Sequence, residues 1–170
     1  MSETFSALTF RTIDPDTDRA LVTAAYRETH RASFGDDQAC SVKSYLPWLR
    51  SRIDEFPDGH LLAFLGKRCV GQLELQVPFG LATGYVNLFY VAPRFRGQGF
   101  GRALHGQAEL YYQSWQAERI ELDVSATNTR AVGFYRHLGY RLTRVDGRIW
   151  RMTRALDPST LISDDRKDTP

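Results

Sequence analysis

The segment Arg96–Arg102 contains residue types that suit one kind of chemistry. It reads Arg-Gly-Gln-Gly-Phe-Gly-Arg, with glycines at alternate positions between two arginines. Glycine lets a backbone turn sharply and approach a ligand without obstruction by a side chain. Exposed NH groups at the start of a helix favour phosphate, and arginine adds charge-assisted hydrogen bonds. The segment therefore predicts a turn that binds pyrophosphate.

Two common nucleotide-binding motifs do not fit this turn. A P-loop ends in Gly-Lys-Ser/Thr, which is missing here, and a dinucleotide-binding turn needs Gly-x-Gly-x-x-Gly. Arg102 and Leu104 stand where that third glycine would have to be. The pattern that remains is Arg-x-x-Gly-x-Gly, formed by Arg96, Gly99 and Gly101.

A second segment, Asn128–Tyr140, combines an asparagine, a tyrosine and a Gly-Tyr ending. In a structural interpretation, Asn128 caps a helix, Ala131 and Leu138 join the core, and Tyr135 buries its ring. In a functional interpretation, only the tips of Asn128 and Tyr135 face a ligand. The two interpretations are compatible, and the residues alone leave both open.

Together the two segments resemble the GNAT superfamily of N-acetyltransferases. Arg-x-x-Gly-x-Gly is similar to its pyrophosphate signature, and Phe89–Pro93 (Phe-Tyr-Val-Ala-Pro) is similar to the strand end before that loop. Asn128–Tyr140 resembles the pattern Asn-x-x-Ala-x-x-x-Tyr-x-x-x-Gly-Tyr/Phe at every named position. It also lies one predicted helix and one predicted strand after the first motif, as in that family.

The resemblance implies transfer of an acetyl group from acetyl-CoA to a primary amine, by direct attack in a ternary complex. It implies that the strand end lies beside the pantetheine arm, with the Val91 NH stabilising the oxyanion. Tyr135 is the expected catalytic general acid, since a phenol is protonated at neutral pH and can hydrogen-bond the leaving sulfur. The residues expected to bind the cofactor are Phe89, Tyr90, Val91, Arg96, Gly97, Gln98, Gly99, Phe100, Gly101, Arg102 and Asn128.

The general base is open. Many members of the family place a glutamate on the strand before the glycine turn, but Tyr85–Phe89 has no carboxylate, and Asn87 stands near the expected place. Glu74, on the polar face of the preceding strand, and bulk water are the candidates. Glu74 could instead be a solvated or hydrogen-bonded strand residue without a catalytic role.

The acceptor amine is not identified by the sequence. The segment Ser33–Asp37 lies where similar enzymes build the acceptor pocket, and Asp36 and Asp37 could attract a cationic amine. An ordinary exposed loop with charges at a helix start explains the same residues. Small amines, antibiotics, peptide N-termini and protein lysines all stay open.

Apolar periodicity predicts the elements that position these residues. A first helix should start at Asp14–Asp16 with Leu21, Ala24, Ala25 and Tyr26 inward, and Asp146-Gly147 should form a hairpin turn.

Residues 1–156 should form one α/β domain, with a mixed, mostly antiparallel sheet of six to seven strands and about four helices, as in the GNAT fold; the polar residues 157–170 should be disordered. The strands are expected at Leu8–Ile13, Leu61–Leu65, Val70–Val77, Tyr85–Val91, Ile120–Val124, Tyr140–Val145 and Arg148–Met152, and the other helices near Ser41, from Arg102 and around Ala131–Leu138.

Composition limits the other classes of function. The net charge of +2 over 170 residues does not indicate nucleic-acid or membrane binding. No signal peptide, no apolar stretch long enough for a membrane span and no metal-binding cysteine or histidine pattern is visible, so we expect a cytoplasmic protein without a metal.

Three further hypotheses stay open. A non-catalytic acyl-CoA sensor or partner-binding module would keep the cofactor site without the chemistry. Homodimerisation is implied only by the resemblance. A nucleic-acid binder would use the arginines of the terminal hairpin, although a solvated strand edge explains them better; these are Arg141, Arg144, Arg148, Arg151 and Arg154.

Overall fold

The computed structural model describes residues 8–36, 38, 40–78 and 80–157. This part of the chain forms an α/β fold with seven strands and four α-helices, as predicted. Asp37 and the predicted disordered residues 158–170 lie outside it. The elements are β1 (Leu8–Thr12), α1 (Arg19–Phe34), α2 (Val42–Glu55), β2 (His60–Leu65), β3 (Arg68–Gln76), β4 (Thr83–Val91), α3 (Phe100–Ser114), β5 (Arg119–Ser125), α4 (Thr129–His137), β6 (Arg141–Asp146) and β7 (Ile149–Ala155).

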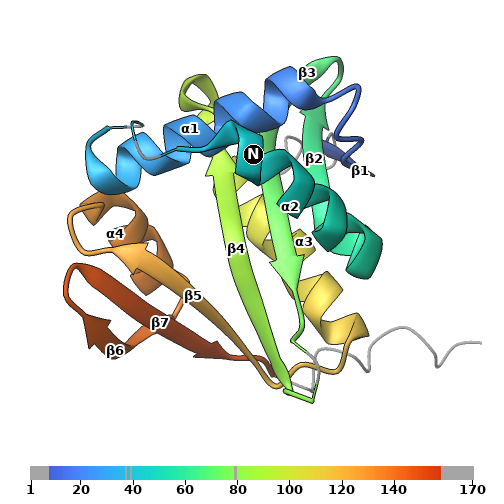
Figure 1. The fold of residues 1–170 in the computed structure, drawn as a ribbon. Helices are drawn as coiled ribbons and strands as arrows, with labels where there is room; N and C mark the ends of the chain where they lie inside the picture. The colour runs from blue at the N-terminus through green and yellow to red at the C-terminus, as the bar shows by residue number, and fades with distance from the viewer. Residues whose placement is uncertain (1–7, 37, 39, 79, 158–170) are drawn as a thin grey trace, which may run out of the picture.

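The strands form one sheet in the order β1-β2-β3-β4-β5-β7-β6. Neighbouring strands are antiparallel except β4 and β5, which are parallel. The parallel pairing joins only Thr83–Val86 to Arg119–Leu122. Beyond it the two strands diverge (Figure 1). The second half of β4 therefore has a backbone edge without a neighbouring strand.

The helices cover both faces of the sheet. Leu104 and Tyr112 of α3 and Val132 of α4 belong to the largest buried cluster, together with residues of β3, β4 and β5. Tyr45 and Leu49 of α2 pack with residues of α1 and β2 in a separate cluster. Figure 1 shows α3 behind the sheet and α2 in front of it. Helices thus pack on both faces of the sheet through apolar side chains. This packing positions the ends of α1, α3 and α4 around the diverging strands.

The predicted start of the first helix was wrong. Residues Asp14–Asp18 form a turn, in which the Asp16 NH donates to Asp14 Oδ1 over 2.9 Å, and α1 begins at Arg19. The buried Asp18 carboxylate accepts two bonds of 2.7 Å from the Arg11 guanidinium. The inward face of α1 was also partly wrong, because Val22 is buried beside Ala25, whereas Leu21 and Ala24 are exposed.

The polar face of β3 is buried rather than solvated. Gln72 and Glu74 alternate with apolar neighbours as predicted, but α1 and α2 cover their face of the sheet, and they are 1% and 0% exposed. A sequence pattern gives the alternation of a strand but not what covers its polar side. Glu74 is therefore a buried acid.

The terminal hairpin differs from the prediction by one residue. Asp146 pairs with Ile149, so the two-residue loop is Gly147-Arg148. Gly147 has φ 56°, which suits the first central position of a type II′ turn. All of β6 is exposed at the sheet edge, in agreement with the interpretation of its arginines as a solvated edge. In β7, Arg151 pairs with Glu121 and Asp123, and Arg154 pairs with Glu109.

Gly84 allows the close packing of α3 on β4. A Cβ atom at this position would lie 2.3 Å from the buried Tyr112 ring. We expect Gly84→Ala to lower the free energy of unfolding by about 1–3 kcal/mol, because overpacking forces the ring or the strand to move. Urea unfolding measures the change. Gly106→Ala on α3 is the matched control, since its Cβ would meet no atom within 4 Å. Equal stability of Gly84→Ala and the unmodified protein would contradict this account of the packing.

Candidate active site

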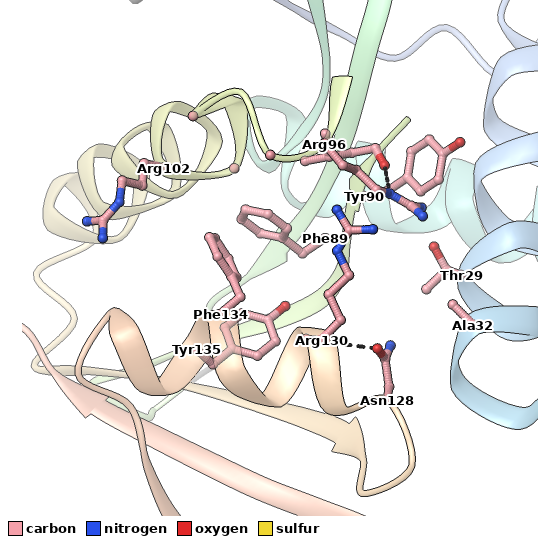
Figure 2. Close-up of a pocket in the computed structure, with 15 residues that line it drawn as sticks. Thr29, Ala32, Phe89, Tyr90, Arg96, Arg102, Asn128, Arg130, Phe134 and Tyr135 are labelled. Atoms are coloured by element: carbon pink, nitrogen blue, oxygen red, sulfur yellow. Dashed lines mark hydrogen bonds between the residues drawn. The ribbon is translucent and has the colours of Figure 1, made fainter. Parts of the chain in front are cut away.

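A cavity of about 380 Å³ opens where β4 and β5 diverge. Figure 2 shows its walls, which come from α1, the end of β4, the glycine turn, α3 and α4. Ten of the twelve predicted site residues are among those that line it. The lining is Thr29, Ala32, Phe89, Tyr90, Val91, Arg96, Gly97, Gly99, Gly101, Arg102, Asn128, Arg130, Ala131, Phe134 and Tyr135.

The glycine turn presents free backbone amides to this cavity. Gly97 and Gly99 have φ values of 72° and 87°, a conformation that L side chains rarely adopt. None of the amides from Gly97 to Gly101 donates a hydrogen bond within the described residues. The same turn leads directly into α3, whose N-terminus adds a positive dipole. Such an arrangement is typical of an anion-binding site.

Gly101 has a packing role beside its place in the motif. A Cβ atom there would lie 3.1 Å from the Phe134 ring of α4, so glycine allows the two helices to approach across the cavity. The side chains of Phe100 and Gln98 do not line the cavity. Phe100 is buried against Phe95, with ring centroids 5.8 Å apart, and Gln98 donates to the Arg94 carbonyl over 2.8 Å. Only their backbone amides are available to a ligand.

Arg96 holds the turn rather than standing free as a phosphate ligand. Its Nε donates to the Val91 carbonyl over 2.7 Å, and its Nη2 pairs with Glu28 of α1. The Tyr90 hydroxyl donates to the other oxygen of Glu28 over 2.7 Å. This network fixes the end of β4 to α1. The lining arginines Arg102 and Arg130 are exposed and are better placed to meet an anion.

Sequence reasoning missed Thr29, Ala32, Arg130, Ala131 and Phe134 as lining residues. Arg130 and Ala131 follow the predicted Asn128 directly, so their neighbourhood was a usable signal. Thr29 and Ala32 lie one turn apart on α1, but nothing in the sequence tells that this helix reaches the glycine turn.

The free edge of β4 directs particular amides into the gap. The Ala92 NH donates to the Val70 carbonyl over 2.8 Å and so points toward β3. Because NH directions alternate along a strand, the NH groups of Val91 and Phe89 point the other way, toward the gap. The Val91 amide therefore faces the gap between β4 and β5.

Tyr135 and Asn128 have both structural and site features. Tyr135 is 8% exposed, and its hydroxyl points into the cavity (Figure 2). Burial raises the pKa of this phenol above its usual value, so it keeps its proton. The Asn128 Oδ1 accepts from the Ala131 NH over 3.2 Å and caps α4, which leaves its Nδ2 for a ligand.

A second cavity of about 600 Å³ lies beside the first, between α1, α2 and the strands β4 and β5. Thr29 lines both cavities, and its buried Oγ1 has no hydrogen-bond partner among the described residues. Ser33 and Phe34 of the predicted acceptor segment line the second cavity. Asp36 is exposed and does not line it. The two cavities together form a site with two compartments that meet at Thr29.

Glu74 lies at the floor of the second cavity in a hydrogen-bond network. Its Oε1 accepts from the Tyr45 hydroxyl and from Gln72 Nε2, the latter over 2.8 Å. Its Oε2 accepts from Asn87 Nδ2 over 2.9 Å. Burial raises the pKa of this carboxyl, and the three donors partly oppose that shift. A carboxylate whose pKa is raised is a stronger proton acceptor than an ordinary one.

The described residues contain no group of three or more His, Cys, Asp or Glu that could hold a metal ion. Cys40 and Cys69 form no disulfide bond within the described part of the chain. No helix in this part of the chain is long and apolar enough to cross a membrane.

The frame of the site is an open mixed sheet that splits at its parallel pair, with a glycine turn leading into a helix at the opening. The sequence pattern of the acetyltransferase (GNAT) family matches residues 22–140. The chain belongs to this family of acetyl-CoA-dependent acyltransferases, and the predicted resemblance is confirmed.

Individual relatives are more distant. The chain is 34% identical over 99 residues to an uncharacterized N-acetyltransferase of Archaeoglobus fulgidus, covering 55% of this chain and 65% of that protein. It is 35% identical over 68 residues to the peptidyl-lysine N-acetyltransferase YjaB of Salmonella typhimurium, covering 39% and 43%. The matches thus span less than two thirds of these curated relatives.

Solved structures agree in fold. The spermidine N-acetyltransferase of Vibrio cholerae, in complex with CoA and spermine, superposes with a TM-score of 0.69 at 19% identity, covering 89% of this chain and 96% of that one. At this identity the likeness supports the fold alone, and the predicted GNAT architecture is confirmed.

Proposed function

We propose that the protein transfers an acetyl group from acetyl-CoA to a primary amine, by direct attack in a ternary complex. The observation that carries this proposal is the set of unpaired backbone amides from Gly97 to Gly101, at the mouth of a cavity beside the free edge of β4. Pyrophosphate fits these amides, with Arg102 and Arg130 nearby, and a pantetheine arm fits the unpaired strand edge. When bound, acetyl-CoA supplies the thioester.

Two groups of the first cavity would then assist the transfer. The Val91 NH faces the gap and would donate to the thioester oxygen as negative charge develops on it. The Tyr135 hydroxyl would give its proton to the sulfur as the carbon–sulfur bond breaks. Tyr135 would regain a proton from the amine nitrogen, which must lose one to become an amide.

Glu74 is the base that this geometry favours. A primary amine arrives as an ammonium ion and must lose one proton before its nitrogen can form the new bond. Because Glu74 is covered by Tyr45, the proton would pass to the Tyr45 oxygen while the Tyr45 proton moves to Glu74 Oε1. The carboxylate becomes a carboxylic acid and later returns this proton to solvent.

The glycine turn gives the most direct test of cofactor binding. We expect Gly99→Glu to abolish acetyl-CoA binding, because a side chain at φ 87° strains the turn and its charge repels phosphate. Isothermal titration measures the affinity. Gly66→Glu is the matched control: it also substitutes a glycine of positive φ, 58°, in open space at the β2–β3 turn, and should bind normally. Absence of binding by the unmodified protein at millimolar acetyl-CoA would contradict the proposed function.

Tyr135→Phe tests the general acid. Loss of a positioned proton donor should lower kcat by about 10²-fold or more, with acetyl-CoA affinity unchanged. Release of free CoA measures turnover. Tyr140→Phe is the control, because the Tyr140 hydroxyl bonds to the buried His105 over 3.0 Å and does not line the cavity. A loss below about threefold in Tyr135→Phe would remove Tyr135 from this role. Cofactor binding without turnover of any amine would favour a non-catalytic binding module.

A pH profile tests Glu74. With a raised pKa, Glu74 is protonated as the pH falls through that value and can no longer accept a proton, so kcat should fall on the acid side. Glu74→Gln should have a kcat lowered at least tenfold and without this acid limb. Glu55→Gln, which removes the carboxylate of an exposed ion pair with Arg52, should keep the unmodified kcat and the acid limb. Persistence of the acid limb in Glu74→Gln would remove Glu74 from the role of base.

A further inference from the structure

We propose that the second cavity binds a monoamine whose single amino group is carried on an aromatic body. This inference rests on the proposed function, and it names the class of acceptor for that reaction. It depends on three features of the cavity: its aromatic walls, its balance of charge and its junction with the first cavity.

Tyrosine, tryptophan and phenylalanine make up four of the eight residues that line the cavity from the helix side. Tyr26 of α1 and Tyr45 of α2 stack in parallel, with ring centroids 4.1 Å apart, and Trp48 continues the row 6.2 Å from Tyr45. Phe34 stands at the end of α1 and is 44% exposed, and Tyr85 of β4 lies among the lining residues of the strand side. Rings prefer offset or edge-to-face contacts with other rings, so a flat aromatic ligand gains more here than an aliphatic one.

The charges of the cavity suit one cation. Two carboxylates, Glu74 and Asp123, line it, and no lysine or arginine is among its described lining residues. Arg151 donates to both oxygens of Asp123 over 2.8 Å and lowers the pKa of that carboxyl, so Asp123 already has a cationic partner. Glu74 has only neutral donors around it. One carboxylate without a cationic partner, covered by the Tyr45 hydroxyl, favours one ammonium group beside Tyr45, whereas a polyamine would bring several charges.

The position of Glu74 orients such an amine. Asn87, which binds Glu74, lies two residues before Phe89 of the first cavity, a distance of about 7 Å along a strand. The amino group would therefore lie at the Thr29 junction, near the thioester, with the aromatic body toward Trp48 and Phe34. The partnerless Thr29 hydroxyl at this junction is available to accept a hydrogen bond from the amine.

The experiment compares acceptors by the release of free CoA. The probes are 2-phenylethylamine, its saturated analogue 2-cyclohexylethylamine, spermidine and a lysine-containing peptide. We expect kcat/KM for 2-phenylethylamine to exceed that of the cyclohexyl analogue about three- to tenfold, and that of spermidine and the peptide by more than tenfold. Equal values for the ring pair, or a preference for spermidine or the peptide, would overturn the inference while leaving acetyl transfer intact. Failure of every amine would overturn the proposed transfer itself.

Variants of the wall give an independent readout. Trp48→Leu should reduce the phenyl-to-cyclohexyl ratio toward one without changing acetyl-CoA affinity, and Phe34→Leu, at the exposed rim, should do so in part. Trp115→Leu is the matched control, because Trp115 is 47% exposed at the end of α3 and does not line the cavity. An unchanged ratio in both wall variants would contradict the proposed location of the aromatic body.

Discussion

The short parallel pairing of β4 with β5 is the constraint on which the rest of the site depends. Pairing ends at Val86, and the strands diverge beyond it, so the end of β4 keeps backbone groups that no strand satisfies. Such groups are costly unless they meet water or a ligand. The divergence is possible because helices on both faces seal the sheet independently of this edge. Apolar packing thus maintains an opening that hydrogen bonding alone would tend to close.

Polar networks then fix the elements around the opening. Glu28 of α1 binds both Tyr90 of β4 and Arg96 of the glycine turn, so one carboxylate holds three segments together. Charge-assisted hydrogen bonds of this kind are stronger than neutral ones and have stricter geometry. A preorganised turn loses little entropy when it meets a ligand, because its amides already point into the cavity. Arg96 therefore fixes the conformation of the turn. The exposed Arg102 and Arg130 supply the positive charge that is available to an anionic ligand.

Local sequence determined how much could be predicted. The glycine turn and the Asn128–Tyr140 segment are each short and continuous in the chain. Their residue types, such as glycine at a sharp turn and asparagine at a helix start, indicate the backbone conformation directly. The partnership of Glu28 with Arg96 joins residues 68 apart, and no periodicity reveals it. The burial of Glu74 was missed for the same reason, since its cover comes from α2. The first helix starts at Arg19, later than predicted, because hydrogen bonds between Asp14 and Asp18 close the preceding residues into a turn. The types of the secondary-structure elements could be predicted from the sequence, whereas contacts between residues far apart in the chain could not.

The two cavities differ in a way that matches the two partners of the proposed reaction. The first has free amides, a helix N-terminus and exposed arginines, and so favours an anion. The second has aromatic rings and an uncompensated carboxylate, and so favours a cation. Opposite charge preferences on either side of Thr29 would keep each partner in its own compartment and bring only their reactive ends together. Such separation raises the effective concentration of amine at the thioester without any movement of the fold. The chemistry would then depend mainly on positioning, with Tyr135 and Glu74 moving protons on opposite sides of the new bond.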